Sequence, residues 1–365
     1  SPIAMKHVLT YAYLDVGGAP GAPFGPYAPY VNWVMSKPSD GNAISAAGIK
    51  VMVYTNPNRE HTTDPLYSND ESTFAHTCAG ARIVSSDGNY LMNPASTNLW
   101  SLWKNLINSY QAQGHIDAFE SDDADDLYGI PALPCGFNGA NWLTATISED
   151  ASVSAPVVYN NLGLFGWDNV SSGINLNASA TGGMLENCYA EWWNPPILHD
   201  GYWRAIENTE IQMAEQRKNL FCFAMSRTPA ASAIGSRLFV YASFLLTYDP
   251  ATSILFEDYS SKPSNFWVFP ESELVALNPV LPAPTTISTL QVSTNVYARE
   301  YSTCYLRGSY LGPCAAVVNS DASSSHPFPF PTKYHHVLAL SGGGVLDGGA
   351  INTTGAAPSM MPALS

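Results

Sequence analysis

Short apolar runs alternate along this chain with longer segments in which apolar residues recur at helical spacing. The runs cover residues 8–16, 48–56, 81–92, 116–122, 155–161, 182–189, 219–226 and 254–258. Each has the length and the content of branched and aromatic residues that a buried β-strand requires. Helical periodicity appears between several of them, at residues 97–113, 142–151, 199–218 and 234–247. Eight strands with helices between them predict an α/β fold, a (β/α)8 TIM barrel with right-handed connections.

Two stretches within the first hundred residues are less regular. Residues 31–47 are expected to be loosely helical. Residues 81–92 are counted here as the third strand, but they can instead form a hairpin around Asp87 and Gly88. An Asp-Gly pair is a preferred two-residue hairpin turn, so both readings stay open.

Helical periodicity ends near residue 279. Pro279, Pro282 and Pro284 follow, and beyond them short alternating runs are separated by Gly, Ser and Pro. That pattern is typical of a small β-domain. We therefore expect a barrel over residues 1–285 and a β-sandwich-like domain over residues 286–365. The linker is short and stiffened by proline, so the second domain is expected to pack on the first.

The charge balance excludes two classes of partner. The chain carries 15 basic and 30 acidic residues, which gives a net charge of −15. Such a field repels nucleic acid and anionic membrane surfaces, and no run of Lys and Arg offsets it. No stretch of 18 apolar residues occurs, so we expect no membrane span.

The composition favours an extracellular protein that meets carbohydrate. Charged residues make up 12% of the chain, whereas Tyr, Phe and Trp number 20, 14 and 9. The chain opens at Ser1 without an apolar leader, which we interpret as the processed form of a secreted protein. Asn169, Asn177 and Asn352 each begin a glycosylation sequon, so a glycoprotein is expected in a eukaryotic host.

The cysteines fit an oxidising compartment. Cys304 and Cys314 bracket a hairpin-sized segment, and we expect them to form a disulfide. Cys78 and Cys135 lie in loops that follow predicted strands and can pair across the barrel mouth. Two cysteines lie within apolar runs, where free thiols are an equal alternative: Cys188 and Cys222.

One acidic stretch dominates the fourth predicted unit. A helical segment stops at Gly114, and a short apolar strand over residues 116–122 leads into a run of carboxylates that begins at Asp122. In (β/α)8 barrels the catalytic groups lie at the carboxyl ends of the strands. Glu120 and Asp122 are two residues apart, so both are expected to point to one side of the sheet. A calcium site or a solvated acidic loop is the alternative.

Glu186, on the sixth predicted strand, is the second acid of interest. Cleaving a glycosidic bond requires one carboxyl group to protonate the leaving oxygen and another to act as nucleophile or base. We expect Glu186 to be the general acid, because apolar residues precede it and aromatic residues follow. We expect Asp122, in a wetter loop, to be the nucleophile or base, with Glu120 as the rival for that role.

Other polar and aromatic residues at predicted strand ends can bind sugar hydroxyls or stack on a sugar ring. They are Tyr13, Asp15, Tyr54, Asn56, Tyr159, Asn160, Trp192, Trp193 and Glu257. For the tyrosines and asparagines the alternative is ordinary packing. For the two acids it is an ion pair with Arg59 or Arg227, and for one of the two tryptophans it is a core contact.

Other mechanisms lack their sequence signatures. There is no G-x-S-x-G elbow of a serine hydrolase and no Gly-rich loop of the P-loop or Rossmann form. No spacing of Cys and His residues typical of zinc occurs. We therefore expect neither a cofactor nor a metal.

The order of segments resembles a known group of enzymes. GIKVMVY at residues 48–54 is followed by DGNYLMNP at residues 87–94, a helix, and IDAFESD at residues 116–122. This order is similar to that of barrel glycoside hydrolases related to the endo-α-1,4-polygalactosaminidases, whose fourth strand reads I-D-G-V-F-x-D. Asp117 and Asp122 keep the five-residue separation, which α-galactosidases also place between an Asp and their nucleophile. Two departures are an Ala in place of the family's Gly and the additional acid between the two aspartates.

The resemblance and the paired acids together imply a secreted glycoside hydrolase that acts on a poly- or oligosaccharide. A non-catalytic carbohydrate-binding or cell-surface protein on the same barrel is the alternative, because a fold does not dictate function. The acids on the fourth and sixth strands discriminate between the two, since a binding protein needs only the aromatic residues.

Overall fold

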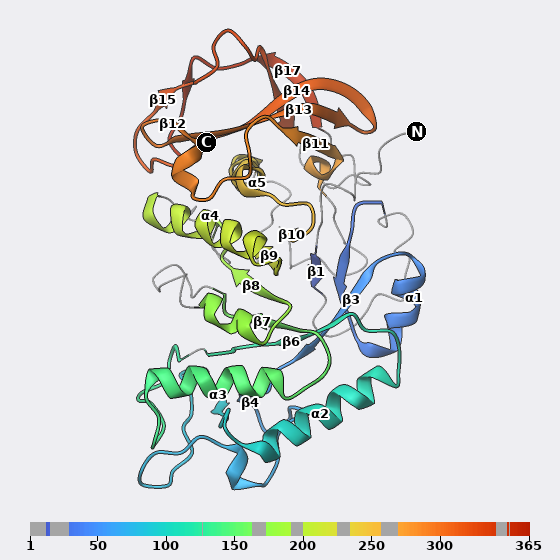
Figure 1. Ribbon diagram of the computed structural model, residues 1–365, viewed down its shortest axis with the longest axis vertical. Helices are drawn as coiled ribbons and strands as arrows, with labels where there is room; N and C mark the ends of the chain where they lie inside the picture. The colour runs from blue at the N-terminus through green and yellow to red at the C-terminus, as the bar shows by residue number, and fades with distance from the viewer. Residues whose placement is uncertain are drawn as a thin grey trace.

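The computed structural model describes residues 12–14, 29–125, 127–162, 173–190, 200–224, 234–256, 269–340, 349 and 351–365. Its central element is a curled sheet of eight parallel strands (Figure 1). In sheet order the strands are β1 (Ala12–Leu14), β2 (Trp33–Met35), β3 (Lys50–Thr55), β6 (Ala118–Ser121), β7 (Val157–Asn160), β8 (Gly182–Glu186), β9 (Asn219–Phe223) and β10 (Ser253–Phe256). β1 and β10, at the two ends of this order, contact each other. The predicted α/β class with a parallel sheet is therefore confirmed.

The inner side of the curled sheet is packed with side chains. The rings of Trp33 on β2 and Phe221 on β9 meet edge to face, with centroids 5.3 Å apart. Four strands separate β2 from β9 in the sheet order, so this contact spans the inner side. Met184 and Ile254 belong to the same buried cluster. These side chains fill the interior of the curled sheet, and the polar residues lie beyond them, at the carboxyl ends of the strands.

The structure corrects one expectation in the first hundred residues and decides between two alternatives in another. Residues 31–47, expected to be loosely helical, contain a helix over Gly41–Ala46, but β2 precedes it. β2 has only three residues, too few for a period-two pattern to show, and a 3-10 turn at Pro38–Asp40 follows it. Residues 81–92 are not a strand of the central sheet. They form the alternative hairpin around Asp87 and Gly88, in which Val84 pairs with Tyr90 and Gly88 has φ of 87°. Its second half, β5 (Tyr90–Leu91), also pairs with β4 (Arg59–Glu60).

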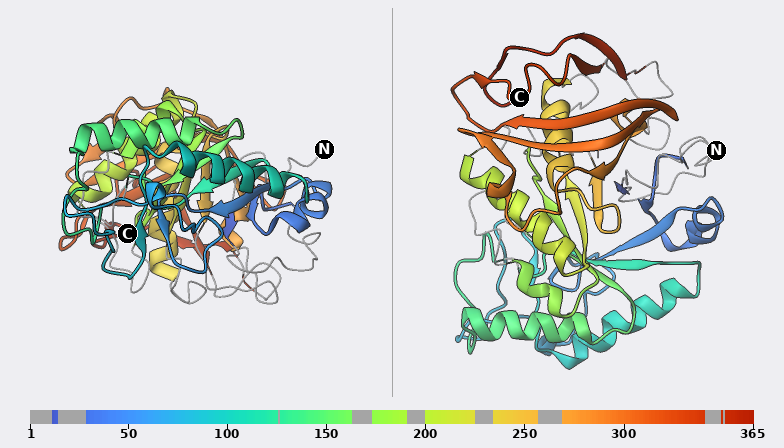
Figure 2. Two further views of the ribbon diagram at one scale, coloured as in Figure 1. Left: turned by 90° about the horizontal axis from the view of Figure 1, so that it is seen from below. Right: turned by 45° about the horizontal axis from the view of Figure 1, so that its top comes forward.

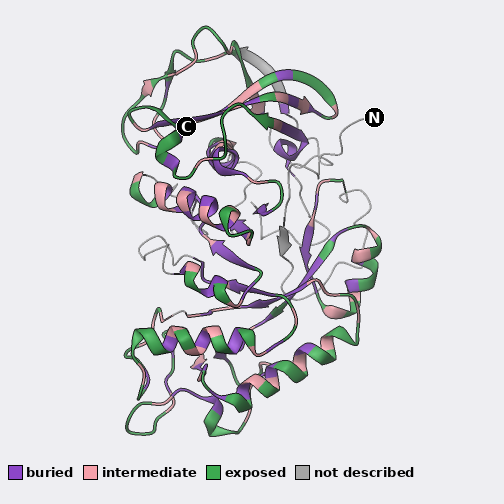
Figure 3. Cartoon of the chain, viewed as in Figure 1, coloured by how far each residue is buried: buried purple, intermediate pink, exposed green. Residues whose placement is uncertain are grey.

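The helices follow the predicted periodicity closely. They are α1 (Gly41–Ala46), α2 (Thr97–Gln111), α3 (Gly139–Ala151), α4 (Asp200–Glu215) and α5 (Ile234–Thr247). α2 buries Leu99, Trp103 and Ile107, which recur every four residues on one face. Its N-terminus is capped by the side chain of Ser96, which accepts a hydrogen bond from the backbone N–H of Leu99 at 3.2 Å. Figure 3 shows the central strands buried and the outer helix faces exposed.

The C-terminal part of the chain forms an antiparallel sheet. It contains β11 (Leu274–Pro279), β12 (Gln291–Ser293), β13 (Val296–Leu306) and β14 (Ser309–Asn319), with β13 paired to the other three. Two small pairs accompany it: β15 (His326–Pro327) with β18 (Met360–Met361), and β16 (His336–Leu340) with β17 (Ile351–Ala356). The two residues between β13 and β14 both have positive φ, 49° for Arg307 and 80° for Gly308. A two-residue hairpin turn of this kind matches the twist of its strands.

This antiparallel sheet packs on helices α4 and α5 (Figures 1 and 2). The ring of Trp203 on α4 lies 4.7 Å from the ring of Tyr297 on β13, measured between centroids. The hydroxyl of Tyr301 donates to the backbone oxygen of Leu245 on α5 at 2.6 Å. One buried apolar cluster includes residues of both parts, so their cores are continuous.

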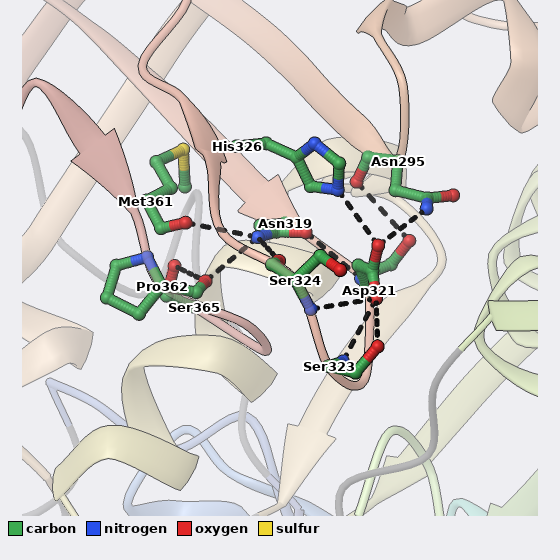
Figure 4. Close-up of polar contacts among 10 residues, drawn as sticks. Asn295, Asn319, Asp321, Ser323, Ser324, His326, Met361, Pro362 and Ser365 are labelled. Atoms are coloured by element: carbon green, nitrogen blue, oxygen red, sulfur yellow. Dashed lines mark hydrogen bonds and ion pairs between the residues drawn. The ribbon is translucent and has the colours of Figure 1, made fainter.

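A polar network holds the C-terminus against the end of β14 (Figure 4). The side-chain amide of Asn319 donates to the backbone oxygens of Ser324 at 3.0 Å, Met361 at 3.2 Å and Pro362 at 2.9 Å. The backbone N–H of Asn319 donates to the oxygen of Ser365 at 2.7 Å. One asparagine thereby supplies hydrogen-bond donors to three backbone carbonyls.

Asp321 organises the neighbouring turn. Its Oδ1 accepts hydrogen bonds from the backbone N–H groups of Ser323 at 2.9 Å and Ser324 at 3.1 Å. Its Oδ2 accepts from His326 Nε2 at 2.9 Å and Asn295 Nδ2 at 3.1 Å. Hydrogen bonds to its charged form, led by the backbone N–H of Ser323, hold the pKa of Asp321 well below its usual value.

All six cysteines form disulfides. The predicted bond between Cys304 and Cys314 is confirmed, and Cys78 pairs with Cys135. The second bond joins the segment after β4 to the loop after β6. Two cysteines that were equally expected to be free are also bonded to each other: Cys188 and Cys222.

Candidate active site

Parallel pairing brings the carboxyl ends of β3, β6, β7 and β8 to one edge of the curled sheet. Tyr54 on β3 is in register with Glu120 on β6, which is in register with Val158 on β7. Asn160 lies two residues after Val158, and Glu186 is the last residue of β8. Alternation along each strand puts Tyr54, Glu120, Asn160 and Glu186 on the same, inner side. All four therefore lie on one side of the sheet, toward the carboxyl ends of their strands.

Asp122 follows β6 directly and receives two hydrogen bonds. The hydroxyl of Tyr54 donates to its Oδ2 at 2.8 Å, and the backbone N–H of Asp123 donates to its Oδ1 at 2.9 Å. Its own backbone N–H donates to the oxygen of Thr55 at 3.1 Å, which extends the pairing of β3 and β6 by one step. The carboxylate is thus fixed by both its own loop and the neighbouring strand.

Glu120 lies deeper and has a different partner. Its side chain is 3% exposed, and its Oε1 accepts a hydrogen bond from Asn160 Nδ2 at 3.1 Å. Its backbone oxygen accepts from the hydroxyl of Thr55, which in turn accepts from Trp103 Nε1 at 3.0 Å. A buried tryptophan of α2 thereby supports the two strands that carry the acids.

Glu120, Asp122 and Glu186, here called the carboxyl cluster, act on one another electrostatically. Burial raises the pKa of Glu120 well above its ordinary value, and the negative charge of Glu186 raises it further. Burial likewise raises the pKa of Asp122, and the charges of Asp123, Glu120 and Glu186 add to the effect, whereas the hydrogen bond from Tyr54 lowers it. Each of these charges therefore opposes the ionisation of its neighbours.

The position of Glu186 is fixed by the segment that follows it. Glu186 is in register with Phe223 on β9. Two residues later, the backbone N–H of Cys188 donates to the oxygen of Phe223 at 3.1 Å, and the disulfide to Cys222 joins the same segment to β9. The end of β8 is therefore held to its neighbour by a covalent bond as well as by sheet pairing.

Three residues that were not assigned from the sequence as site residues also surround Asp122: Asn58, Ser121 and Asp123. Asn58 Nδ2 donates to Ser121 Oγ at 3.1 Å and to the backbone oxygen of Asp122 at 2.5 Å. Asp123 Oδ2 accepts from Asn56 Nδ2 at 2.8 Å, and its backbone has φ of 53°. Asp tolerates this left-handed conformation better than most residues. The Asn-Pro-Asn sequence directly after β3 was the available signal, since such residues follow strands as polar turns.

A further set of acids is buried near the carboxyl cluster. Glu60 on β4 and Glu149 and Asp150 at the end of α3 are each at most 1% exposed. Burial, with the charges of Asp64 and Asp123, raises the pKa of Glu60 to about 9. Burial raises the pKa of Asp150 to about 7. Sequence reasoning missed Glu149 and Asp150, because acids in an amphipathic helix usually belong to its solvated face.

Tyr159, a candidate for sugar binding, and Asp117, the first acid of the family motif, lie away from the carboxyl cluster. Tyr159 was expected at the strand ends, but it faces away from Asn160, is fully buried, and donates to Asn177 Oδ1 at 2.8 Å. Its position on the opposite face follows from strand alternation, so its predicted contact with sugar is wrong. Asp117 lies at the other end of β6, where its Oδ2 accepts from the backbone N–H of Val51 at 2.8 Å.

The remaining candidates for sugar binding lie outside the described residues. They are Asp15, Trp192, Trp193, Glu257 and the side chain of Tyr13. Within the ranges that the structure does describe, no three His, Cys, Asp or Glu side chains converge as a metal site. In the same ranges no helix is long and apolar enough to cross a membrane.

No family model and no curated protein matches the chain. Several solved structures are similar at low identity. A sulfoquinovosidase from E. rectale is 14% identical with a TM-score of 0.47, and the match covers 73% of this chain and 45% of that one. A maltogenic alpha-amylase from Thermotoga neapolitana is 10% identical with a TM-score of 0.45, over 98% and 99% of the two chains. A protein from Aspergillus fumigatus solved with galactosamine is 10% identical with a TM-score of 0.40, over 69% and 92%.

Proposed function

We propose that this protein is a secreted glycoside hydrolase that cleaves glycosidic bonds in a poly- or oligosaccharide. The observation that carries the proposal is the carboxyl cluster. Acids from the ends of two parallel strands share the inner side of the curled sheet, and each raises the pKa of another. Glycosidases require one carboxyl that keeps its proton beside another that is ionised, and this cluster supplies both states.

The roles follow from the partners of each acid. Asp122 is the nucleophile or base, because the hydroxyl of Tyr54 and the backbone N–H of Asp123 both donate to it. Donors favour the charged form of a carboxyl group. Glu186, at the end of β8, is the general acid. Glu120, buried and held by the amide of Asn160, retains its proton and serves as a neutral neighbour.

The substrate is a neutral or cationic sugar chain. Tyr54, Asn56 and Asn160 surround the carboxyl cluster with groups that hydrogen-bond to hydroxyls. The net charge of −15 and the acids of the site disfavour polysaccharides rich in carboxylate or sulfate. Three disulfides suit an oxidising compartment such as the cell exterior.

The same proposal includes the architecture. Residues 1–285 form a (β/α)8 barrel, supported by the order of the eight parallel strands and the contact between β1 and β10. Residues 286–365 form the C-terminal β-domain. β11 precedes this boundary and yet pairs with β13, so the two parts share a sheet.

A screen of the purified protein against a panel of polysaccharides, with detection of new reducing ends, tests the proposal. The panel includes neutral glucans and galactans, a cationic polyamine glycan such as chitosan, and anionic pectin. Release of reducing ends from a neutral or cationic member is the expected result. Binding to a member without any release supports the alternative of a non-catalytic carbohydrate-binding protein and contradicts the proposal.

A further inference from the structure

The segment directly after Glu186 has an unusual backbone. Asn187 has φ of 58° and Tyr189 has φ of 64°, so two of the three residues that follow the proposed general acid adopt the left-handed conformation. Asn tolerates this conformation, but for a bulky side chain such as Tyr it is a genuine outlier. Residues keep such a conformation only where their surroundings impose it, and they gather at functional sites. Specific contacts therefore hold Tyr189 in place.

One of these contacts is a buried hydrogen bond to helix α4. The hydroxyl of Tyr189 donates to Glu210 Oε2 at 2.9 Å, and both residues are fully buried. The bond joins the segment after β8 to the helix that precedes β9. Without an acceptor, a buried tyrosine hydroxyl would lose the hydrogen bonds that it makes with water in the unfolded chain. Glu210 thus fixes the ring, and the ring fixes the backbone three residues beyond Glu186.

Glu210 belongs to a polar network on the buried face of α4. Glu207, nearly one turn earlier, is also fully buried and accepts from the hydroxyl of Thr247 on α5 at 2.5 Å. The positive charge of Arg299 on β13 lowers the pKa of both acids, whereas burial raises it. Buried acids are unfavourable unless they have such partners. The network therefore links α5 and the C-terminal sheet, through α4, to the segment after Glu186.

The same segment is also held from the side of β9. The backbone N–H of Cys188 donates to the oxygen of Phe223 at 3.1 Å, and Cys188 is bonded to Cys222. Cys188 is thus attached to β9, and the next residue, Tyr189, is attached to α4. Anchors on two elements restrict the direction in which β8 ends, and Glu186 is the last residue of β8.

We propose that Tyr189 and Glu210 are positioning residues for Glu186. Their hydrogen bond holds the segment after β8 in its left-handed conformation and keeps the Glu186 carboxyl in the carboxyl cluster. Both residues are fully buried, so they act through Glu186 and do not touch the substrate. The inference rests on the proposed role of Glu186 as general acid. A general acid must lie within hydrogen-bond reach of the leaving oxygen, so a small displacement removes much of its effect.

The dependence of the rate on the leaving group tests the proposal, because it separates loss of the general acid from a loss of folding. A phenyl glycoside needs a proton on its leaving oxygen, whereas dinitrophenol leaves readily as its anion. Both substrates are prepared from an oligosaccharide of the polysaccharide that the screen identifies, and kcat/KM is measured for each. Glu186→Gln is the reference, which should lose far more activity on the phenyl glycoside than on the dinitrophenyl glycoside.

Tyr189→Phe removes the hydroxyl and keeps the ring. We expect kcat/KM on the phenyl glycoside to fall by about 10- to 100-fold and kcat/KM on the dinitrophenyl glycoside to stay within about threefold of the wild type. Glu210→Leu removes the acceptor and should reproduce this pattern, and the double variant should lose no more than either single variant. Glu210→Gln keeps an acceptor oxygen and should retain most of the activity on both substrates.

Tyr159→Phe is the matched control, because its hydroxyl is equally buried and donates to Asn177 at 2.8 Å, outside the segment after Glu186. It should lower the Tm about as much as Tyr189→Phe does and leave kcat/KM on both substrates unchanged. Equal losses on the two substrates in Tyr189→Phe, or no loss, beside a selective loss in Glu186→Gln, would overturn this inference and leave the proposed function intact. A wild-type protein that cleaves no polysaccharide, or a Glu186→Gln variant without selectivity, would overturn both.

Discussion

Glu120 and Asp122 are two residues apart and share one side of the sheet, yet their surroundings differ. Glu120 is buried and held by an amide, whereas Asp122 receives a hydroxyl and a backbone N–H. Burial raises the pKa of both groups, and hydrogen bonds act in the opposite direction, because a donor favours the charged form of a carboxyl group. In the proposed site these bonds favour the ionised form of Asp122.

Tyr54→Phe tests whether the Tyr54 hydroxyl lowers the pKa of Asp122. The hydrogen bond lowers the pKa of Asp122, so its removal raises that pKa. The acidic limb of the pH profile of kcat/KM should move to higher pH, and kcat/KM should fall by about tenfold, the loss of one charge-assisted bond. Tyr110→Phe, on α2, is the control. An unchanged pH profile in Tyr54→Phe would show that the hydroxyl does not govern the ionisation.

Glu120→Gln tests the proposal that Glu120 is a neutral neighbour of Asp122. Burial raises the pKa of Glu120, and Gln resembles the protonated acid, so the acidic limb of the pH profile of kcat/KM should stay where it is in the wild type. The value of kcat should stay within about tenfold of the wild type. A fall of kcat by about 10²-fold or more would instead identify Glu120 as the catalytic carboxylate.

At this scale strand parity predicted that Glu120 and Asp122 share one side of the sheet, whereas Tyr54, Asn160 and Glu186 were selected because they stand at strand ends. Tyr159 was selected in the same way, but alternation along β7 turns it to the opposite face. Asn58 lies in a turn, and its partners come from 63 and 64 residues further along the chain, a pairing that no local pattern encodes. Side chains on strands are predictable from alternation, whereas side chains on turns depend on tertiary contacts.

The length of a helix or strand decided whether it could be predicted from the sequence. α5 spans Ile234–Thr247 as its periodicity indicated, because 14 residues give an unambiguous helical pattern. β2 has three residues and leaves no pattern of its own. Its place in the sheet is fixed by pairing with β1 and β3, which the sequence does not display.

The turn around Asp321 makes the stability of the C-terminal segment depend on pH. The pKa of Asp321 is depressed in the folded protein, so its contribution is present above its ordinary pKa of about 3.9 and is lost as the pH falls through the folded value. Asp321→Asn should therefore lower the Tm at pH 7, and the difference from the wild type should shrink between pH 5 and pH 2. Thermal unfolding at a series of pH values measures this. A difference that is constant with pH would contradict the assignment.

For the whole molecule, the continuous core between the helices and the C-terminal sheet implies joint stability. Trp203 is fully buried, donates to Ser243 Oγ at 2.9 Å and packs on Tyr297. Trp203→Ala should lower the free energy of unfolding by about 3–5 kcal/mol and increase cleavage near Pro284. Trp100→Ala on α2, far from the sheet, should not change that cleavage. Limited proteolysis of the wild type that releases two independently folded pieces would contradict the shared core.

The packing of the C-terminal segment was predicted from its short proline-containing linker and its apolar content. The participation of β11 in its sheet was not, because β11 lies before the prolines that indicated the boundary. The prolines show where the helical part of the chain ends. Which strands belong to the C-terminal sheet depends on pairing between residues on both sides of that boundary, which the composition does not show.

The central claim is that Asp122 and Glu186 carry out glycosidic cleavage together. The most direct measurement is kcat for Asp122→Asn and Glu186→Gln on the polysaccharide that the screen identifies, with Glu71→Gln as a control for an exposed acid held by Arg82. If the account is right, each site variant keeps the wild-type Tm and loses about 10²–10⁴-fold in kcat, while the control stays fully active. If both site variants retain kcat within about tenfold of the wild type, the carboxyl cluster does not perform the reaction.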